Sequence, residues 1–298
     1  NDFPFDASMA HLKGSLVAQA IAPGNTLGAV IRAGTETNSK AVFHELLFGM
    51  DVVGASPNAK PVLTVLMDKF SPITPESYIF TYLREHLVKL AFQPASNFLV
   101  LKFLDSLEKG NPEVNKAVVD IFAGQWLSLG ISRNGGASIL SRIIELQAPL
   151  LADSPLFESL GPHLRDLCLS EPGHICMKRL IEVSKPVSQT HTIVTYMLDS
   201  LNEISADRFG CYVMVELLSA VPNFDTPGEN PILTAFAPHL FHLSKNSDSA
   251  SVVTKLVSKV KCSEVAHETF HKAFNGKWAE MALHTISSPT VQAVTKKM

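Results

Sequence analysis

One short stretch of the chain carries residue types that could bind a metal ion, the sequence HETFH from His267 to His271. Two histidines four residues apart share one face of a helix, where they could ligate zinc with Glu268 as the base of a hydrolase. The extended form of this motif needs a glycine and a third histidine further along, but Phe274 and Lys277 occupy those positions. We therefore predict that the stretch is an ordinary polar helix face and that the chain has neither a metal site nor a cofactor.

Other arrangements that support catalysis are missing from the sequence. It contains no glycine-rich phosphate loop between a strand and a helix, no nucleophile elbow and no paired carboxylates. The glycine pair Gly135-Gly136 falls in a turn between two expected helices, which is not the context of a dinucleotide site. We predict a binding protein with no catalytic residues.

Contact with a polyanion is a second kind of chemistry that the residues could perform. Lys178 and Arg179 are adjacent, and the segment from Lys245 to Met298 has eight lysines against four acidic residues. The net charge is −3, whereas proteins that bind phosphates are usually basic, so composition permits nucleic-acid binding without requiring it. The Lys-Arg pair could also be a solvated helix face. Three aromatic residues could stack on bases or lie in the core: Phe98, Tyr212 and Trp278.

The elements that must position these residues recur along the chain. Four stretches align, each a polar or glycine-containing turn followed by a short apolar helix: NGGASILSRIIEL, EPGHICMKRLIEV, RFGCYVMVELLSA and SDSASVVTKLVSK. Their first helical residues, Ala137, His174, Cys211 and Ala250, are 37, 37 and 39 residues apart. Such a period is typical of helical repeats, which must stack to bury their apolar faces. The sequence therefore predicts an all-α fold, an α-solenoid of stacked repeats that forms a curved superhelix with one concave surface.

The same pattern extends in both directions with lower fidelity. Further short helices, each the second of its pair, are expected to start at Lys40, Asn97 and Lys277. The helix that begins at Ser77 is either another second helix or the first helix of the pair that leads to Asn97, and the segment from Gly14 to Ala22 is expected to be an incomplete terminal repeat. We predict a single array over residues 1–298, divergent over 1–84 and clearer over 85–298.

Composition limits the class of protein. Hydrophobic residues make up 46% of the chain and charged residues 18%, which indicates a folded chain, and no apolar run is long enough for a membrane span. Four cysteines without a CxxC pair favour a reducing compartment. The chain begins at Asn1 without an initiator methionine or a signal peptide, so we expect a fragment or a processed form.

The second helices resemble those of the Pumilio (PUF) family of RNA-binding repeats. That family places a small or polar residue first, a stacking residue second, two apolar residues next and a polar reader fifth, followed by a basic residue and an apolar run. RFGCYVMVELL and GHICMKRLIE match this layout closely, NGGASILSRIIE and SASVVTKLV moderately, and SNFLVLKFL and GKWAEMAL loosely. The resemblance covers roughly residues 85 to 290 and implies an array that binds RNA.

In that family the first, second and fifth positions of the second helix face the RNA on the concave surface. One base per repeat can then be hydrogen-bonded along its edge and stacked between side chains. Carried over to this chain, the resemblance implies that the following residues face RNA: Asn97, Phe98 and Leu101; Ala137, Ser138 and Ser141; His174, Ile175 and Lys178; Cys211, Tyr212 and Val215; Ala250, Ser251 and Thr254; Lys277, Trp278 and Met281.

The chain also departs from the family pattern. Members that read sequence carry Gln or Glu at the fifth position, and none of the six predicted fifth positions does, so we expect weak discrimination between bases. Backbone or single-strand contact would then use the basic residues near the rim, which are Arg142, Lys178, Arg179, Lys255 and Lys277.

This departure is similar to that of the degenerate, nucleolar members of the family. The resemblance implies a role in ribosomal-RNA processing or ribosome assembly, with ribosomal or pre-ribosomal RNA and ribonucleoprotein subunits as partners. It also implies a nucleolar or nuclear location, with the mitochondrion or cytoplasm as alternatives. The acidic net charge and the missing readers leave open a protein-interaction scaffold of the HEAT or armadillo type.

Overall fold

The chain folds into pairs of short helices. The structure, a computed structural model, describes residues 14–93, 96–148, 155–184, 187–221, 231–260, 264–284 and 286–296. Within these residues, extended pairing is limited to one isolated bridge, between Ile73 and Leu107. None of the described helices is long and apolar enough to cross a membrane. Contacts divide the chain into two compact units, Asn1–Leu150 and Leu151–Met298.

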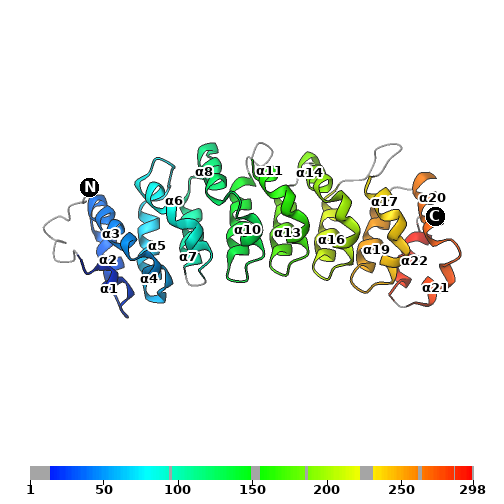
Figure 1. The fold of residues 1–298 in the computed structure, drawn as a ribbon, viewed down its shortest axis with the longest axis horizontal. Coiled ribbons are helices and arrows are strands. Elements are labelled where there is room, and N and C mark those ends of the chain that lie inside the picture. The colour runs from blue at the N-terminus through cyan, green and yellow to red at the C-terminus, as the bar shows by residue number, and fades with distance from the viewer. Residues whose placement is uncertain are drawn as a thin grey trace. The chain divides into compact units, whose positions relative to one another are not determined.

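The first unit contains one row of helices that pack on each other in sequence order, α2 on α5, α5 on α7 and α7 on α10 (Figure 1). We call these the second helices, because each follows one or two other helices that we call the first helices. The second helices are α2 (Leu27–Ala33), α5 (Lys60–Lys69), α7 (Asn97–Ser106) and α10 (Gly136–Gln147). The other helices of the unit are α1 (Leu16–Ile21), α3 (Glu36–Phe48), α4 (Met50–Ala55), α6 (Tyr78–Ala91), α8 (Pro112–Phe122) and α9 (Trp126–Gly130), with a 3-10 turn at Pro57–Ala59.

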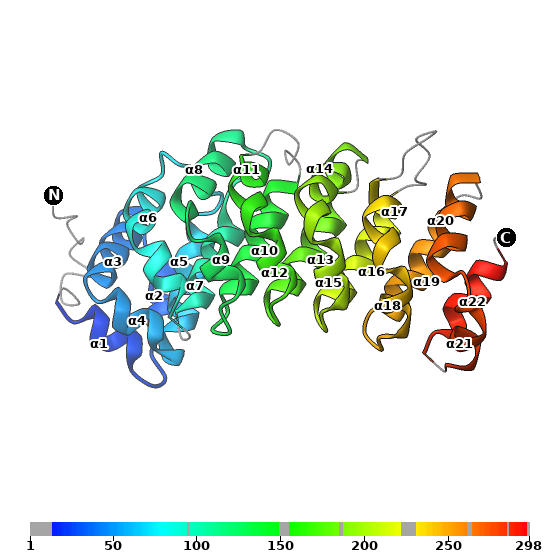
Figure 2. The same ribbon diagram turned by 45° about the vertical axis from the view of Figure 1, so that its right-hand side comes forward.

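The second unit repeats the plan with α13 packed on α16, α16 on α19 and α19 on α22 (Figure 1). These second helices are α13 (Gly173–Val183), α16 (Gly210–Ala220), α19 (Ala250–Lys259) and α22 (Ser288–Thr295). Figure 2 shows their first helices, which come in two pieces. They are α11 (Leu156–Leu160) with α12 (Leu164–Cys168), α14 (Val187–Met197) with α15 (Leu201–Ala206), α17 (Pro231–Phe236) with α18 (Leu240–Lys245), and α20 (Glu264–Phe274) with α21 (Trp278–Leu283).

The breaks in two first helices follow from proline. Pro162 and Pro238 each lie in a 3-10 turn between the two helical pieces, at Gly161–His163 and Ala237–His239. Proline lacks the backbone N–H that an α-helix would use at that point, and its ring clashes with the preceding turn, so the helix restarts one turn later.

Burial gives the second helices a common register. In α5, α7, α10, α13, α16 and α19, two adjacent apolar residues and the two residues one turn later are buried against the neighbouring helices. We number these buried residues as positions 3, 4, 7 and 8 of the second helix. They are Val62, Leu63, Leu66 and Met67 in α5; Leu99, Val100, Phe103 and Leu104 in α7; Ile139, Leu140, Ile143 and Ile144 in α10; Cys176, Met177, Leu180 and Ile181 in α13; Val213, Met214, Leu217 and Leu218 in α16; and Val252, Val253, Leu256 and Val257 in α19.

The residue just before position 1 is small in every one of these helices and is buried in the elbow between first and second helix. Serines at this place in α7, α19 and α22 donate their hydroxyl hydrogen bonds to a carbonyl six residues earlier, such as Ser249 Oγ to the Leu243 oxygen at 2.8 Å. Glycine takes this place in α10, α13 and α16, where a Cβ atom would collide with a backbone carbonyl, as Gly210 would with the Ile204 oxygen at 2.2 Å. The elbow thus requires a small side chain for steric reasons.

The structure confirms the all-α repeat fold and five of the predicted second helices, those near Asn97, Ala137, His174, Cys211 and Ala250. The helix beginning after Ser77 is α6, a first helix that leads to α7.

Two predicted starts of second helices are wrong. Lys40 lies inside the first helix α3, and the second helix of that repeat is α5, which begins at Lys60. Lys277 is the residue before α21, which is one piece of a first helix, whereas α22 is the helix that packs on α19. With α2, α5 and α22 included, eight second helices lie within the described residues.

Candidate functional site

Positions 2 and 5 of the numbered second helices lie outside the buried positions 3, 4, 7 and 8, and position 1 does so in α5, α7, α10 and α13; we call these positions the exposed face. The structure places the predicted residues of five helices, α7, α10, α13, α16 and α19, at these equivalent positions within each unit. Position 2 shows the exposure most clearly, since the largest exposed apolar side chains of the second helices are Ile175 on α13 and Tyr212 on α16, at 57% and 59%.

Exposed residues lie at equivalent positions of the adjacent helices α13 and α16 in the second unit, and we call the surface that carries Ile175 and Tyr212 the slot. Ile175 and Tyr212 occupy the same position on two helices that pack side by side, and both side chains are exposed. The ring of His174 lies 6.3 Å from the ring of Tyr212 and stacks on Phe209 at 5.4 Å. Exposed Lys178 adds an ammonium group one helical turn after His174. The slot thus combines two exposed large side chains with two groups that can form hydrogen bonds.

The hydrogen bond of His174 fixes the role of each ring nitrogen. Its Nδ1 lies 2.5 Å from the carbonyl oxygen of Glu171, and a carbonyl can only accept, so Nδ1 carries the proton. In the neutral imidazole, Nε2 is then an acceptor. Lys178 offers only donors. A donor and an acceptor one turn apart are suited to the edge of a nucleobase, which presents both kinds of group.

Side chains of the first unit also connect position 1 with the next repeat. Asn97 Nδ2 donates to the carbonyl oxygen of Asn134 at 2.8 Å, in the turn before α10. Lys60, at position 1 of α5, holds its ammonium 4.9 Å from the centre of the Phe98 ring, which is half-buried at position 2 of α7. Ser138 is exposed at position 2 of α10, and Ser141 is half-buried at position 5.

Two predicted site residues at position 1 are buried by their neighbours. Cys211 is 4% exposed, and its thiol donates to the carbonyl oxygen of Arg208 at 3.2 Å. Burial, with the carboxylates of Asp248 and Asp207, raises the pKa of this thiol, so it remains protonated. Ala250 is also buried. At these two repeats the exposed face consists of positions 2 and 5, which in α19 are Ser251 and Thr254.

The correction at the C-terminal end changes which residues belong to the exposed face. Lys277 and Trp278 lie at the junction of α20 and α21, where Lys277 Nζ is 4.0 Å from the centre of the Phe241 ring and Trp278 packs on Phe274. Met281 is fully buried and cannot face a ligand. The equivalent helix is α22, in which positions 1, 2 and 5 are Ser288, Pro289 and Gln292.

Gln292 is therefore exposed at a fifth position, where the predicted register had placed Met281. The repeat spacing is the signal that could have found this helix. Ser288, at position 1 of α22, follows Ala250 by 38 residues, which is close to the spacing of the other repeats. The α5 residues at positions 1, 2 and 5, which are Lys60, Pro61 and Thr64, were missed in the same way.

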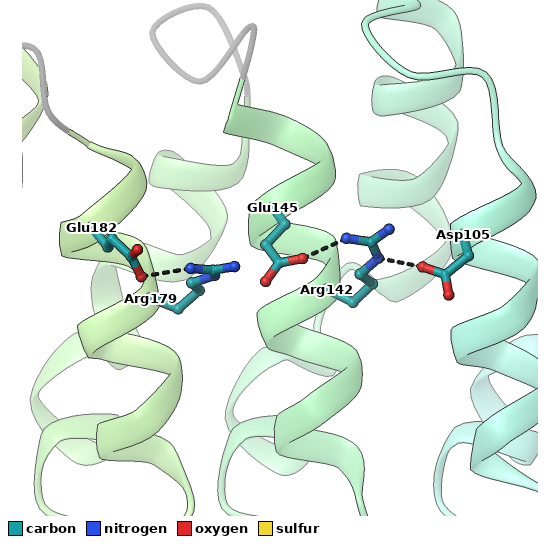
Figure 3. A network of polar contacts seen from close by, with 5 residues as sticks. All are labelled: Asp105, Arg142, Glu145, Arg179 and Glu182. Carbon is teal, nitrogen blue, oxygen red and sulfur yellow. Dashed lines mark hydrogen bonds and ion pairs between the residues drawn. The ribbon is translucent and has the colours of Figure 1, made fainter.

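The basic residues predicted at the rim have different environments. Arg142 on α10 donates to Asp105 on α7 and to Glu145 on α10, both at 2.5 Å (Figure 3). Arg179 on α13 donates to Glu182 at 2.5 Å (Figure 3). Partial burial opposes the charge of Arg142, but the hydrogen bonds and charges of the two carboxylates outweigh it and raise the pKa of this guanidinium. These two arginines are held by carboxylates.

The HETFH stretch lies on α20, where His267 and His271 stack with ring centroids 6.5 Å apart. Glu268 forms an ion pair of 2.7 Å with Lys272. Across the part of the chain that the structure describes, no group of three or more His, Cys, Asp or Glu side chains is arranged to hold a metal ion.

Solved structures share this fold over almost the whole chain. The RNA-binding domain of yeast Puf5p bound to MFA2 RNA superposes with a TM-score of 0.74 at 14% identity, covering 94% of this chain and 82% of that one. The Puf4 RNA-binding domain bound to the HO endonuclease RNA 3′ UTR recognition sequence gives 0.70 at 14% identity, covering 91% and 83%. PUF-8 in complex with PBE-RNA gives 0.64 at 14% identity, covering 97% and 84%. No family model matches the sequence, and no curated protein matches it. The chain therefore has the Pumilio-repeat fold.

Proposed function

We propose that this protein binds RNA through the exposed face of its second helices. The observation that carries the proposal is the slot, in which Ile175 and Tyr212 stand exposed at the same position of adjacent helices. Packed helices lie about 8–10 Å apart. A base in van der Waals contact with a side chain on each face needs about 7–8 Å. We propose that a planar group enters edge first between these two side chains.

The polar groups of the slot support a nucleobase as that planar group. His174 Nε2 accepts and Lys178 Nζ donates, so both kinds of hydrogen bond that a base edge requires are available. A protein ligand would more often present one apolar anchor to a pocket with few polar groups. The shared fold with RNA-bound Puf domains agrees with this assignment.

We further propose that base discrimination is weak at most repeats. Leu101 and Val215 occupy the fifth position of α7 and α16 and cannot hydrogen-bond a base edge. Polar fifth positions with long side chains are limited, among the described second helices numbered here, to Lys178 and Gln292. Stacking tolerates any base, since every base has an aromatic face. The array would then hold RNA mainly by stacking and backbone contacts.

Weak base reading favours abundant, structured ribonucleoprotein targets over short regulatory sequences. We propose a role in ribosomal-RNA processing or ribosome assembly, in the nucleolus or nucleus, with the two units acting as a single array. Crosslinking of the tagged protein to RNA in cells, followed by sequencing, should enrich precursor ribosomal RNA. Enrichment of a defined element in messenger-RNA 3′ ends would contradict this role and leave RNA binding itself intact.

The binding test is fluorescence anisotropy with a labelled pool of random-sequence single-stranded RNA. Replacement Tyr212→Ala should weaken binding about 5- to 150-fold, which corresponds to the 1–3 kcal/mol measured for base stacking on aromatic residues. Tyr196→Ala is the matched control, because Tyr196 is also exposed but lies on the first helix α14. Its affinity should equal that of the wild type.

Two outcomes would redirect the assignment. No retention of RNA by the wild-type protein at low salt would favour the protein-interaction scaffold, in which the same face holds a peptide. Equal losses for the Tyr212 and Tyr196 variants would show that the slot is not the binding surface.

A further inference from the structure

A second set of exposed positions on the second helices carries charge. Position 6, which follows the fifth position, is a lysine or arginine in four helices, and position 9 carries a carboxylate in four helices. The position 6 cations are Lys102 on α7, Arg142 on α10, Arg179 on α13 and Lys255 on α19. The position 9 carboxylates are Asp68 on α5, Asp105 on α7, Glu145 on α10 and Glu182 on α13.

Three of the four cations are neutralised by these carboxylates. Lys102 Nζ lies 2.6 Å from Asp68 on the preceding second helix. Arg142 bridges Asp105 on the preceding helix and Glu145 on its own (Figure 3). Arg179 pairs with Glu182 one turn further along α13. The pairing thus follows one rule, in which a position 6 cation binds a position 9 carboxylate of its own or the preceding helix.

Lys255 occupies the same position without such a partner. Position 9 is Ser219 on the preceding helix α16 and Ser258 on its own helix α19. The Ser219 carbonyl accepts a hydrogen bond from Lys259 Nζ at 3.1 Å instead. Of the described acidic side chains, none forms an ion pair with Lys255, which is half-buried at the edge of the exposed face.

We infer that the position 9 carboxylates keep Lys102, Arg142 and Arg179 from binding RNA phosphates, and that Lys255 is the phosphate ligand of this row. The inference rests on the proposed RNA-binding function. A phosphate that approached Lys102 or Arg142 would have to displace a carboxylate hydrogen-bonded to the cation, and it would come within a few ångströms of that negative charge. Lys255 forms no ion pair with a described carboxylate, so a phosphate that binds it displaces none. RNA phosphates are therefore directed to Lys255 and away from the paired cations Lys102, Arg142 and Arg179.

The inference is tested by the salt dependence of binding to the same random-sequence RNA pool. For single-stranded nucleic acids the slope of log K against log salt changes by about 0.7 for each phosphate contact. Lys255→Gln should reduce the slope by about 0.7. Lys102→Gln is the matched control, with the same residue type at the same helix position, and should leave the slope unchanged.

A gain-of-function variant makes the test independent of loss by misfolding. Asp68→Asn removes the carboxylate and leaves Lys102 free, so its slope should become steeper by about 0.7 and RNA should bind more tightly at low salt. Asp105→Asn combined with Glu145→Gln should do the same through Arg142. Circular dichroism of each variant confirms that the helices remain folded.

The experiments distinguish an error in this inference from an error in the proposed function. If wild-type protein binds RNA, but Lys102→Gln flattens the slope as much as Lys255→Gln, or Asp68→Asn leaves it unchanged, the assignment of the two lysines is wrong. If wild-type protein binds no RNA at any salt concentration, the proposed function itself is wrong.

Discussion

The elbow before each second helix gives a prediction whose size follows from the coordinates. Gly210 lies in the elbow that leads to α16, and a Cβ atom there would lie 2.2 Å from the Ile204 carbonyl oxygen. Cβ contacts below 3.0 Å essentially never occur, so Gly210→Ala must move two backbone segments apart by at least 0.8 Å. Such overpacking costs about 1–3 kcal/mol. The higher helix propensity of alanine offsets about 0.5–1 kcal/mol of this cost. We expect a net loss of about 1–2 kcal/mol.

The consequence reaches the slot, because Tyr212 follows Gly210 by two residues. A shift at the start of α16 moves the Tyr212 ring relative to Ile175, so RNA affinity should fall together with stability. Unfolding by urea, followed by circular dichroism, measures the stability, and fluorescence anisotropy measures the affinity. Since a repeat array can unfold in parts, the midpoint of the transition is compared between variants measured under identical conditions.

A glycine in another second helix provides the control. Gly28 lies within α2, and a Cβ atom there would meet its nearest neighbour, a methyl group of Val65, at an ordinary 3.7 Å. Gly28→Ala should therefore be neutral or stabilising by about 0.5–1 kcal/mol. If Gly210→Ala is as stable as the wild type, or if Gly28→Ala destabilises equally, the steric account of the elbow is wrong.

Two further predictions test the register and the buried thiols. Gln292→Ala should weaken RNA binding by about 1 kcal/mol. Trp278→Ala should lower the urea midpoint and leave RNA affinity unchanged, because Trp278 packs on Phe274 within a first helix. The reverse result would show that α21, and not α22, is the second helix of the last repeat. Burial, with the Asp207 carboxylate, raises the pKa of the Cys168 thiol, so the thiol ionises only in the unfolded chain. The free energy of unfolding should therefore be constant below the unfolded thiol pKa of about 8.5 and fall above it, by up to about 1.4 kcal/mol per pH unit for this group. Urea midpoints measured across that range should fall less steeply for Cys168→Ala, and an equal fall would assign the effect to other groups.

The sequence predicts a second helix well where glycine or serine in the elbow precedes two apolar pairs. This pattern is present in α10, α13, α16 and α19, and their starts were correctly predicted to within one residue. It fails in α5 and α22, which both have proline at position 2, Pro61 and Pro289. Proline is tolerated in the first turn of a helix, where its missing N–H would have no helical partner.

The residues of the site could be predicted only in those second helices whose first residue was predicted correctly. Exposure of Ile175 and Tyr212 follows from their position next to the first buried pair, and the structure bears out that placement. The burial of Cys211 could not be read from its position, because it depends on how closely the Arg208 turn approaches the thiol. The ion pairs of Lys102 and Arg142 join residues 34 and 37 apart, so they became visible only after the helices were stacked.

The net charge of −3 no longer argues against an RNA-binding face once the ion pairs are considered. The charge of a whole chain reports on phosphate binding only if its cations are available, and here Lys102, Arg142 and Arg179 are held by carboxylates. The pairs of Lys102 with Asp68 and of Arg142 with Asp105 join consecutive second helices of the first unit, so these two cations stabilise the stack on which the exposed face depends. RNA binding by the proposed face would then derive its free energy mainly from stacking at position 2, with few phosphate contacts. In the arrangement that we propose, the paired charges of the second helices stabilise their stacking, and the exposed side chains at position 2 bind RNA.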